Sequence, residues 1–175
     1  MDPPERETVS LSASARVVEC NFFSETPAMV VQGHGIASGK NYDARFPQGT
    51  LAMQIPIFEK LGLNFSDFFQ GTINLDVSPS SFKLGKPAFC FTKVEWSRNI
   101  PAEDFSFFPC RLEDSNSSVT GYIYWPHPST KPGFYQPANV LEMIAPHMPT
   151  VKYGAKFNLV ALYNSITFCL ADETP

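Results

Sequence analysis

The spacing of proline and glycine is the feature of this chain that most restricts its fold. The sequence contains 16 prolines and 10 glycines, and they recur along its whole length. Proline removes a backbone donor and glycine weakens regular elements, so such frequent breaks disfavour long helices. The pattern predicts a β-rich chain of short strands joined by turns.

Length and composition predict a single domain over residues 1–175. A hydrophobic content of 43% supports one sizeable core, and 175 residues are too few for two domains of average size. The chain carries 16 phenylalanines and only 17% charged residues, which indicates a packed aromatic interior rather than a disordered chain. We expect flexibility only near the ends, with residues 1–14 as a flexible N-terminal segment.

Charge and apolar patterning exclude two classes of partner. The formal net charge is −4, and the lysines and arginines form no basic stripe that would bind a phosphate backbone, so we expect no nucleic-acid partner. The sequence has neither a signal peptide nor an apolar run of membrane-spanning length, so we expect no membrane partner and a cytoplasmic location.

The cysteines are too far apart for a zinc site of the CxxC type. Each lies in an apolar or strand-like context, so we expect reduced thiols in the core, which suits a reducing cytosol. The four are Cys20, Cys90, Cys110 and Cys169.

Alternating β-branched and aromatic residues predict a series of strands and one short helix. The strands are expected at 15–23, 29–31, 71–77, 88–96, 105–112, 119–125, 139–144, 157–163 and 165–170. The helix is expected at 56–61, because Pro56 suits a first helical turn and Gly62 stands at a stop position. These elements predict an all-β or β-rich α+β fold, as a small barrel or sandwich. The proline-rich loop 126–137 is a candidate lid or binding loop.

Four motifs occur in a characteristic order between residues 30 and 162. They are GHG at 33–35, IFEKLG at 57–62, GTINL at 71–75 and LEMIAP at 141–146. Each motif is short, but their shared order and spacing resemble the archaeal CTP-dependent riboflavin kinases. The resemblance implies a divergent homologue of that family, with a small closed cradle-loop barrel of six strands that binds CTP and riboflavin on one rim. It implies transfer of a phosphoryl group from a nucleoside triphosphate to riboflavin or a similar hydroxyl acceptor.

The resemblance also implies a nucleotide site made of two segments. Its residues are Gly33, His34, Gly35, Ile36, Ala37, Ser38, Ala145, Pro146, His147 and Met148. Glycine lets the backbone approach a phosphate, and bare amides can cradle an anion. The chain departs from the family at Ala37, where a third closely spaced glycine is usual, and at Pro149, which replaces a basic residue. The alternative is an ordinary glycine turn, with Lys40 and Arg45 as solvated surface charges.

Thr72 and Asn74 are the metal ligands that the resemblance implies. They stand two apart on a predicted strand, so their side chains point to one face. Mg²⁺ takes oxygen ligands and keeps several waters, so a hydroxyl and an amide oxygen can complete a shell dominated by triphosphate oxygens. Without the resemblance, a strand edge whose side chains satisfy neighbouring backbone groups is the better interpretation.

Glu142 and Thr130 are the flavin contacts that the resemblance implies. A carboxylate at 142 can also accept the proton of the attacking hydroxyl, which makes Glu142 the candidate catalytic residue, in either an orienting or a general-base role. The alternative is a salt-bridged or exposed strand residue. Thr130 is a weaker match, because no histidine follows it closely as in the family.

Two other functions stay open. The first is a non-catalytic barrel that binds a nucleotide, flavin or sugar in a regulatory role, which the departures at Ala37, Lys131 and Pro149 favour. The second is an enzyme with another substrate, in which Trp125 and Tyr135 stack on a flat ring. No GxSxG, HExxH, Walker A or dinucleotide fingerprint occurs. The sequence leaves the oligomeric state undetermined.

Overall fold

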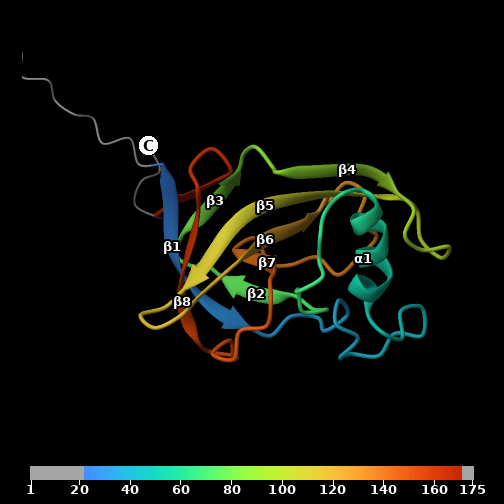
Figure 1. Ribbon diagram of the computed structural model, residues 1–175, viewed down its shortest axis with the longest axis horizontal. Coiled ribbons are helices and arrows are strands. Elements are labelled where there is room, and N and C mark those ends of the chain that lie inside the picture. The colour runs from blue at the N-terminus through green and yellow to red at the C-terminus, as the bar shows by residue number, and fades with distance from the viewer. Residues whose placement is uncertain (1–21, 171–175) are drawn as a thin grey trace, which may run out of the picture.

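The computed structural model describes residues 22–170 and is built around a large antiparallel sheet (Figure 1). Most of the strand expected at 15–23, the segment 1–14 and Cys20 lie outside the described residues. The described elements are β1 (Phe23–Val31), α1 (Thr50–Lys60), β2 (Ile73–Asp76), β3 (Ser81–Leu84), β4 (Phe89–Val94), β5 (Glu103–Glu113), β6 (Ser118–Pro126), β7 (Val140–Ile144), β8 (Lys156–Leu162) and β9 (Ile166–Cys169).

The strand pairings connect six strands in a ring. Seven strands follow the order β4-β5-β6-β7-β2-β1-β8, and β5 also pairs with β8, so hydrogen bonding returns to β5. Strand β4 is attached to β5 outside the ring, while β3 and β9 form a separate two-stranded sheet. The prediction of a β-rich fold with one short helix is confirmed for residues 22–170. Strand β3 was not predicted, because SFKL alternates polar and apolar residues over only four positions, which is a weak signal.

The helix starts earlier than the sequence indicates. It begins at Thr50, so Pro56 lies inside it, and the prediction of Pro56 in the first turn is wrong. A proline inside a helix removes one hydrogen bond, but packing of an apolar face supplies most helical stability in a folded protein. Here Leu51, Ile55 and Phe58 form that face. The end of the helix is confirmed, because Gly62 follows it with φ of 99°, a conformation that favours glycine.

Two apolar clusters form the interior. One contains fully buried residues from the ring of strands, including Leu75, Leu112, Leu141 and Leu159. The other joins α1 to β4, β5 and β6 through aromatic side chains. Phe58 is its centre, with ring centroids 5.0 to 6.0 Å from those of Phe65, Phe91, Phe105 and Phe107. These contacts hold the helix at the side of the sheet (Figure 1).

Only one of the described cysteines belongs to the core. Cys110 is buried, and burial raises the pKa of its thiol to about 12. Cys90 and Cys169 are free but exposed, so the expectation that they lie in the core is wrong. Their strands, β4 and β9, stand outside the ring, where alternate side chains face solvent. No helix within residues 22–170 is both long and apolar enough to cross a membrane.

Replacing Phe58 by alanine is expected to reduce the free energy of unfolding by about 3–5 kcal/mol, because it leaves a cavity among four aromatic rings. The matched control is Phe23→Ala, at a side chain that is 56% exposed, where a change within about 0.5 kcal/mol is expected. Urea unfolding of the three proteins measures both effects. Similar losses in the two variants would contradict the central role of Phe58.

Candidate functional site

The pairing of β2 with β7 places three polar side chains on one face of the sheet. Asn74 stands directly opposite Glu142, while their neighbours Leu75 and Leu141 point into the core. Thr72, just before β2, lies on the same side as Asn74, and its Oγ1 donates a hydrogen bond to Glu142 Oε1 at 3.4 Å. The sequence motifs GTIN and LEMIAP therefore meet through strand pairing.

Asn74 is held in place by two neighbours. Its side chain is 8% exposed, and its Oδ1 accepts a hydrogen bond from Gln136 Nε2 at 3.0 Å. A Cβ atom on Gly33 would collide with the Asn74 amide, so a larger residue there would displace the amide from its present position. The first predicted phosphate-loop residue thus contacts a predicted metal ligand.

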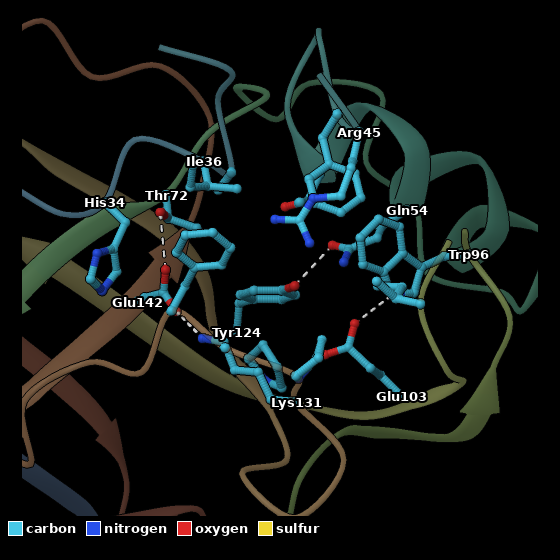
Figure 2. Close-up of a pocket in the computed structure, with 18 of the residues that line it drawn as sticks. His34, Ile36, Arg45, Gln54, Thr72, Trp96, Glu103, Tyr124, Lys131 and Glu142 are labelled. Atoms are coloured by element: carbon cyan, nitrogen blue, oxygen red, sulfur yellow. Dashed lines mark hydrogen bonds and ion pairs between the residues drawn. The ribbon is translucent and has the colours of Figure 1, made fainter. Parts of the chain in front are cut away.

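Two pockets meet at Thr72. The first, here called the α1 pocket, has a volume of about 360 Å³ and lies between the helix, β6, β7 and the loop after β6 (Figure 2). The second, here called the β2 pocket, has a volume of about 450 Å³ and lies beside β2 and the segment after β7. Thr72 lines both, whereas Glu142 lines the α1 pocket and Asn74 lines the β2 pocket.

The residues predicted to bind nucleotide are divided between these pockets. His34, Gly35, Ile36 and Ala37 line the α1 pocket. Ala145, Pro146, His147 and Met148 line the β2 pocket. Gly33 and Ser38 line neither, although Gly33 packs on Asn74 and Ser38 lies close to Gly71. The two segments of the expected site are thus adjacent but do not surround one cavity.

The glycine loop keeps a row of unused amides. Gly39 N donates to Ile36 O at 3.2 Å and Asn41 N donates to Gly35 O at 3.0 Å, which closes the turn. The amides of residues 34–38 form no hydrogen bond to any residue in 22–170. The positive φ values fall on Gly35 and Gly39, both at 71°, so Ala37 needs no glycine-specific conformation. Alanine in place of the family's glycine at position 37 is therefore compatible with a loop that binds an anion through its backbone amides.

Thr130 lines neither large pocket. Its Oγ1 accepts a hydrogen bond from Asp104 N at 2.9 Å and donates one to His127 O at 3.2 Å. These bonds shape the loop after β6, so that the next residue, Lys131, reaches the α1 pocket. There Lys131 Nζ lies 3.5 Å from Glu142 Oε2, with both side chains largely buried. Glu142 thus forms a salt bridge, as the alternative interpretation expected, and it also lines a pocket.

Sequence reasoning missed the polar residues at the other end of the α1 pocket. Tyr124 donates to Gln54 Oε1 at 2.8 Å, and Trp96 Nε1 donates to Glu103 Oε2 at 2.6 Å. Burial raises the pKa of Glu103, while the Trp96 hydrogen bond and the charge of Lys131 oppose that rise. Gln54 precedes the predicted helix and Glu103 precedes the predicted strand, so no sequence pattern connected them.

Aromatic side chains and one lysine line the β2 pocket. The rings of Phe69 and His147 lie 6.2 Å apart. Lys40 is exposed, and its Nζ donates to Tyr153 Oη at 3.2 Å and sits 4.9 Å from the centre of that ring. Lys152 lines this pocket, whereas Lys40 is not one of its lining residues. Arg45 is half-exposed and paired with Asp43 at 2.7 Å, but it borders the α1 pocket.

The donor set fits magnesium better than a metal with many protein ligands. Within residues 22–170, no group of three or more histidine, cysteine, aspartate or glutamate side chains could hold an ion. The oxygens of Thr72, Asn74 and Glu142 are the donors near the junction of the pockets. Mg²⁺ is compatible with so few protein ligands because phosphates and waters fill most of its coordination shell.

The aromatic pair Trp125 and Tyr135 lines a separate cavity of about 100 Å³, well below the size of an ordinary ligand pocket. This cavity adjoins the α1 pocket, since Lys131 and Glu142 border both. The Trp125 ring packs edge-on against Phe82, and Tyr135 Oη donates to Lys131 O at 2.6 Å. This geometry gives no support to the idea that they stack on a flat substrate.

Neither the scan against protein-family models nor the search of curated proteins gives a match to this chain. The two pockets and their chemistry are therefore the basis for a function.

Replacing Glu103 by glutamine is expected to stabilise the protein increasingly as the pH rises. The native state binds the Glu103 proton more tightly than the unfolded chain does, because the pKa of Glu103 is raised in the native state. Its contribution to stability is therefore fully present below pH 4.5, the pKa of the unfolded chain, and is lost as the pH rises through the native pKa. Glutamine stays neutral and keeps an acceptor for Trp96. Each unit of pKa difference is worth about 1.4 kcal/mol.

Urea unfolding at about pH 4 and about pH 7.5 measures this effect. Glu113→Gln, at an exposed ion pair with Arg111, is the matched control and is expected to show no comparable gain. A Glu103→Gln difference that is the same at both pH values would contradict the raised pKa.

Proposed function

We propose that this protein is a phosphotransferase of the CTP-dependent riboflavin kinase type. The observation that carries the proposal is the junction of two pockets at Thr72, with Asn74 and Glu142 on either side of it. A kinase needs this arrangement, because the donor phosphate and the acceptor hydroxyl must meet in line at one point. Three of the four sequence motifs of the resemblance, GHG, GTINL and LEMIAP, supply residues to these two pockets, whereas IFEKLG lines neither of them.

The β2 pocket is the proposed nucleotide site. Its apolar and aromatic lining, including Phe69, His147 and Tyr153, suits a planar base. Lys152 supplies a positive charge three residues after Pro149, where the family has a basic residue closer to the motif. The free amides of residues 34–38 are the proposed contacts for the phosphates, which would extend past Thr72 from the β2 pocket into the α1 pocket that residues 34–37 line.

Thr72 and Asn74 are the proposed ligands of a magnesium ion. Bound with the nucleotide, the ion would neutralise charge on the phosphates as the transferred group moves. Thr72 Oγ1 and Asn74 Oδ1 already accept or donate hydrogen bonds in a fixed geometry, so they are preorganised to orient such a ligand. Gly33 keeps the phosphate loop against Asn74.

The α1 pocket is the proposed acceptor site, with Glu142 at its junction end. Glu142 would accept the proton of the acceptor hydroxyl while that oxygen forms a bond to the γ-phosphorus. The bond between the γ-phosphorus and the bridging oxygen breaks, and the nucleoside diphosphate leaves. Lys131, 3.5 Å from Glu142, would orient the carboxylate. A flavin contact for Thr130 stays a prediction, and its present hydrogen bonds shape the loop that carries Lys131.

We further infer that the ring of six strands is a closed cradle-loop barrel. The pairings of β5 with both β6 and β8 support closure, and so do fully buried side chains such as Leu75, Leu141 and Leu159 inside the ring. The proposed sites lie on the outer side of β2 and β7, where loops cover the sheet.

A non-catalytic binding module is the second candidate. Asn74 is occupied by Gln136, and Glu142 by both Lys131 and Thr72, so each proposed active group already has a protein partner. A regulatory ligand-binding protein would retain such satisfied pairs. Turnover assays separate the two candidates.

Replacing Thr72 by valine is expected to weaken binding of magnesium with CTP by roughly tenfold or more, because a hydroxyl ligand is lost while the side-chain shape is kept. Calorimetry with and without Mg²⁺ measures this loss, which should vanish when the ion is omitted. Thr120→Val, at an exposed position of β6, is the matched control. Equal affinity of both variants for Mg·CTP would remove Thr72 from the site.

Replacing Glu142 by glutamine is expected to reduce riboflavin turnover with CTP and Mg²⁺ by roughly a hundredfold or more, because the proton acceptor is lost and the shape is kept. ATP serves as the alternative donor, and Glu113→Gln as the matched control outside both pockets. Wild-type turnover equal to the blank with both donors would contradict the kinase proposal and favour the binding module. Full activity in the variant would keep the kinase and remove Glu142 from its mechanism.

A further inference from the structure

One end of the α1 pocket has no part in the phosphoryl transfer proposed above. Figure 2 shows Thr72 and Glu142 at one side of the pocket and Gln54, Trp96 and Glu103 at the other, with Tyr124 between them. The second group comes from α1, from the segment after β4 and from the start of β5. A ligand that reaches Glu142 with a hydroxyl would extend its remaining part toward this end.

Two buried polar residues at this end have unused atoms. Gln54 is 2% exposed and Glu103 is 4% exposed. Gln54 Oε1 accepts from Tyr124, and Glu103 Oε2 accepts from Trp96, but Gln54 Nε2 and Glu103 Oε1 have no hydrogen-bond partner among residues 22–170. These atoms are not sealed in the interior, because Ser165 Oγ is the only fully enclosed side-chain polar atom without a partner in that range.

The unused atoms form a complementary pair. Gln54 Nε2 is a donor and Glu103 Oε1 is an acceptor, and both belong to residues that border the α1 pocket. Buried polar groups are almost always hydrogen-bonded, because leaving them without partners is costly. Because these two atoms are reachable and not enclosed, a ligand that carries both an acceptor and a donor can satisfy them.

Aromatic side chains give this end flat and rigid walls. The Tyr124 ring stacks on Phe105 with centroids 5.8 Å apart at 25°, and its hydroxyl is tied to Gln54. Trp96 packs against Phe46 at 5.3 Å, and its ring nitrogen is tied to Glu103. The same hydrogen bonds that use one atom of Gln54 and Glu103 thus hold the aromatic walls. Such walls suit a planar ring.

The charges around the pocket favour a neutral ring. Two carboxylates, Glu103 and Glu142, and two basic groups, Arg45 and Lys131, line it. Lys131 pairs with Glu142 and its charge also acts on Glu103, so it balances both ends. A neutral heterocycle can therefore enter without leaving an uncompensated charge.

We propose that the Gln54 end of the α1 pocket binds a planar heterocycle through an adjacent carbonyl and ring N–H, as in a lactam or imide. The carbonyl accepts from Gln54 Nε2, and the ring N–H donates to Glu103 Oε1. Gln54 and Glu103 thereby select the acceptor molecule. The inference rests on the proposed function only in placing the hydroxyl of that molecule at Glu142.

Lumiflavin tests the inference separately from catalysis. It carries the flavin ring with its imide edge but no ribityl chain, so it has no hydroxyl to phosphorylate. Binding to the full chain is measured by fluorescence titration, alongside lumiflavin methylated at N3, which lacks the ring N–H. We expect lumiflavin to bind, and the N3-methyl compound to bind roughly tenfold or more weakly.

Two variants remove the polar partners while keeping the aromatic walls. Gln54→Glu retains an acceptor for Tyr124 but loses the donor, and Glu103→Gln retains an acceptor for Trp96 but loses the carboxylate. Each is expected to weaken lumiflavin binding by roughly tenfold to a hundredfold. Glu103→Gln should also reduce the discrimination against N3-methylation. Matched controls are Gln48→Glu at an exposed loop position and Glu113→Gln, which are expected to bind like the wild type.

Thermal unfolding of each variant checks that it is folded, and the comparison of the two ligands on the wild type needs no mutation. Equal affinity for lumiflavin and its N3-methyl form, or no binding of lumiflavin up to its solubility, would overturn the inference. Selective lumiflavin binding without riboflavin turnover would support this ring site and contradict the kinase proposal. Riboflavin turnover together with equal affinity for lumiflavin and its N3-methyl form would support the kinase proposal and overturn this ring site.

Discussion

The register of β2 against β7 is the constraint on which the candidate site depends. It places Asn74 opposite Glu142 and sends Leu75 and Leu141 into the core. Because strand side chains alternate, a shift by one residue would bury the polar pair and expose the leucines. The hydrophobic core therefore enforces the arrangement of the polar groups, and stability and site geometry are linked through the same four residues.

The helix extends this constraint to the far end of the α1 pocket. Phe58 anchors α1 among the aromatic rings of β4 and β5, and Gln54, one turn earlier, is thereby brought to Tyr124 on β6. The face of the helix that packs in the core is the same face that carries a polar group to the pocket. Aromatic packing thus has two roles here, since it holds the helix and also orients a hydrogen-bonding amide.

Hydrogen bonds between side chains organise the pockets without closing them. Gln136 holds Asn74, Lys131 pairs with Glu142, and Trp96 binds Glu103. Asn74 and Glu103 each have one side-chain atom with a protein partner, and both oxygens of Glu142 have one, while all three residues stay accessible from a cavity. Such partial satisfaction keeps side chains in place before a ligand arrives, which lowers the entropy lost on binding.

The sequence by itself determined the strand-rich class, the positions of most strands and the end of the helix at Gly62, because alternation and turn residues are local signals. It also predicted that Thr72 and Asn74 share a face. Only the tertiary structure decided that Gln54 and Glu103 face one pocket, that Pro56 lies inside α1, and that Cys90 and Cys169 are exposed. These features depend on contacts between residues far apart in the chain, and the free energy of such packing overrides local preference.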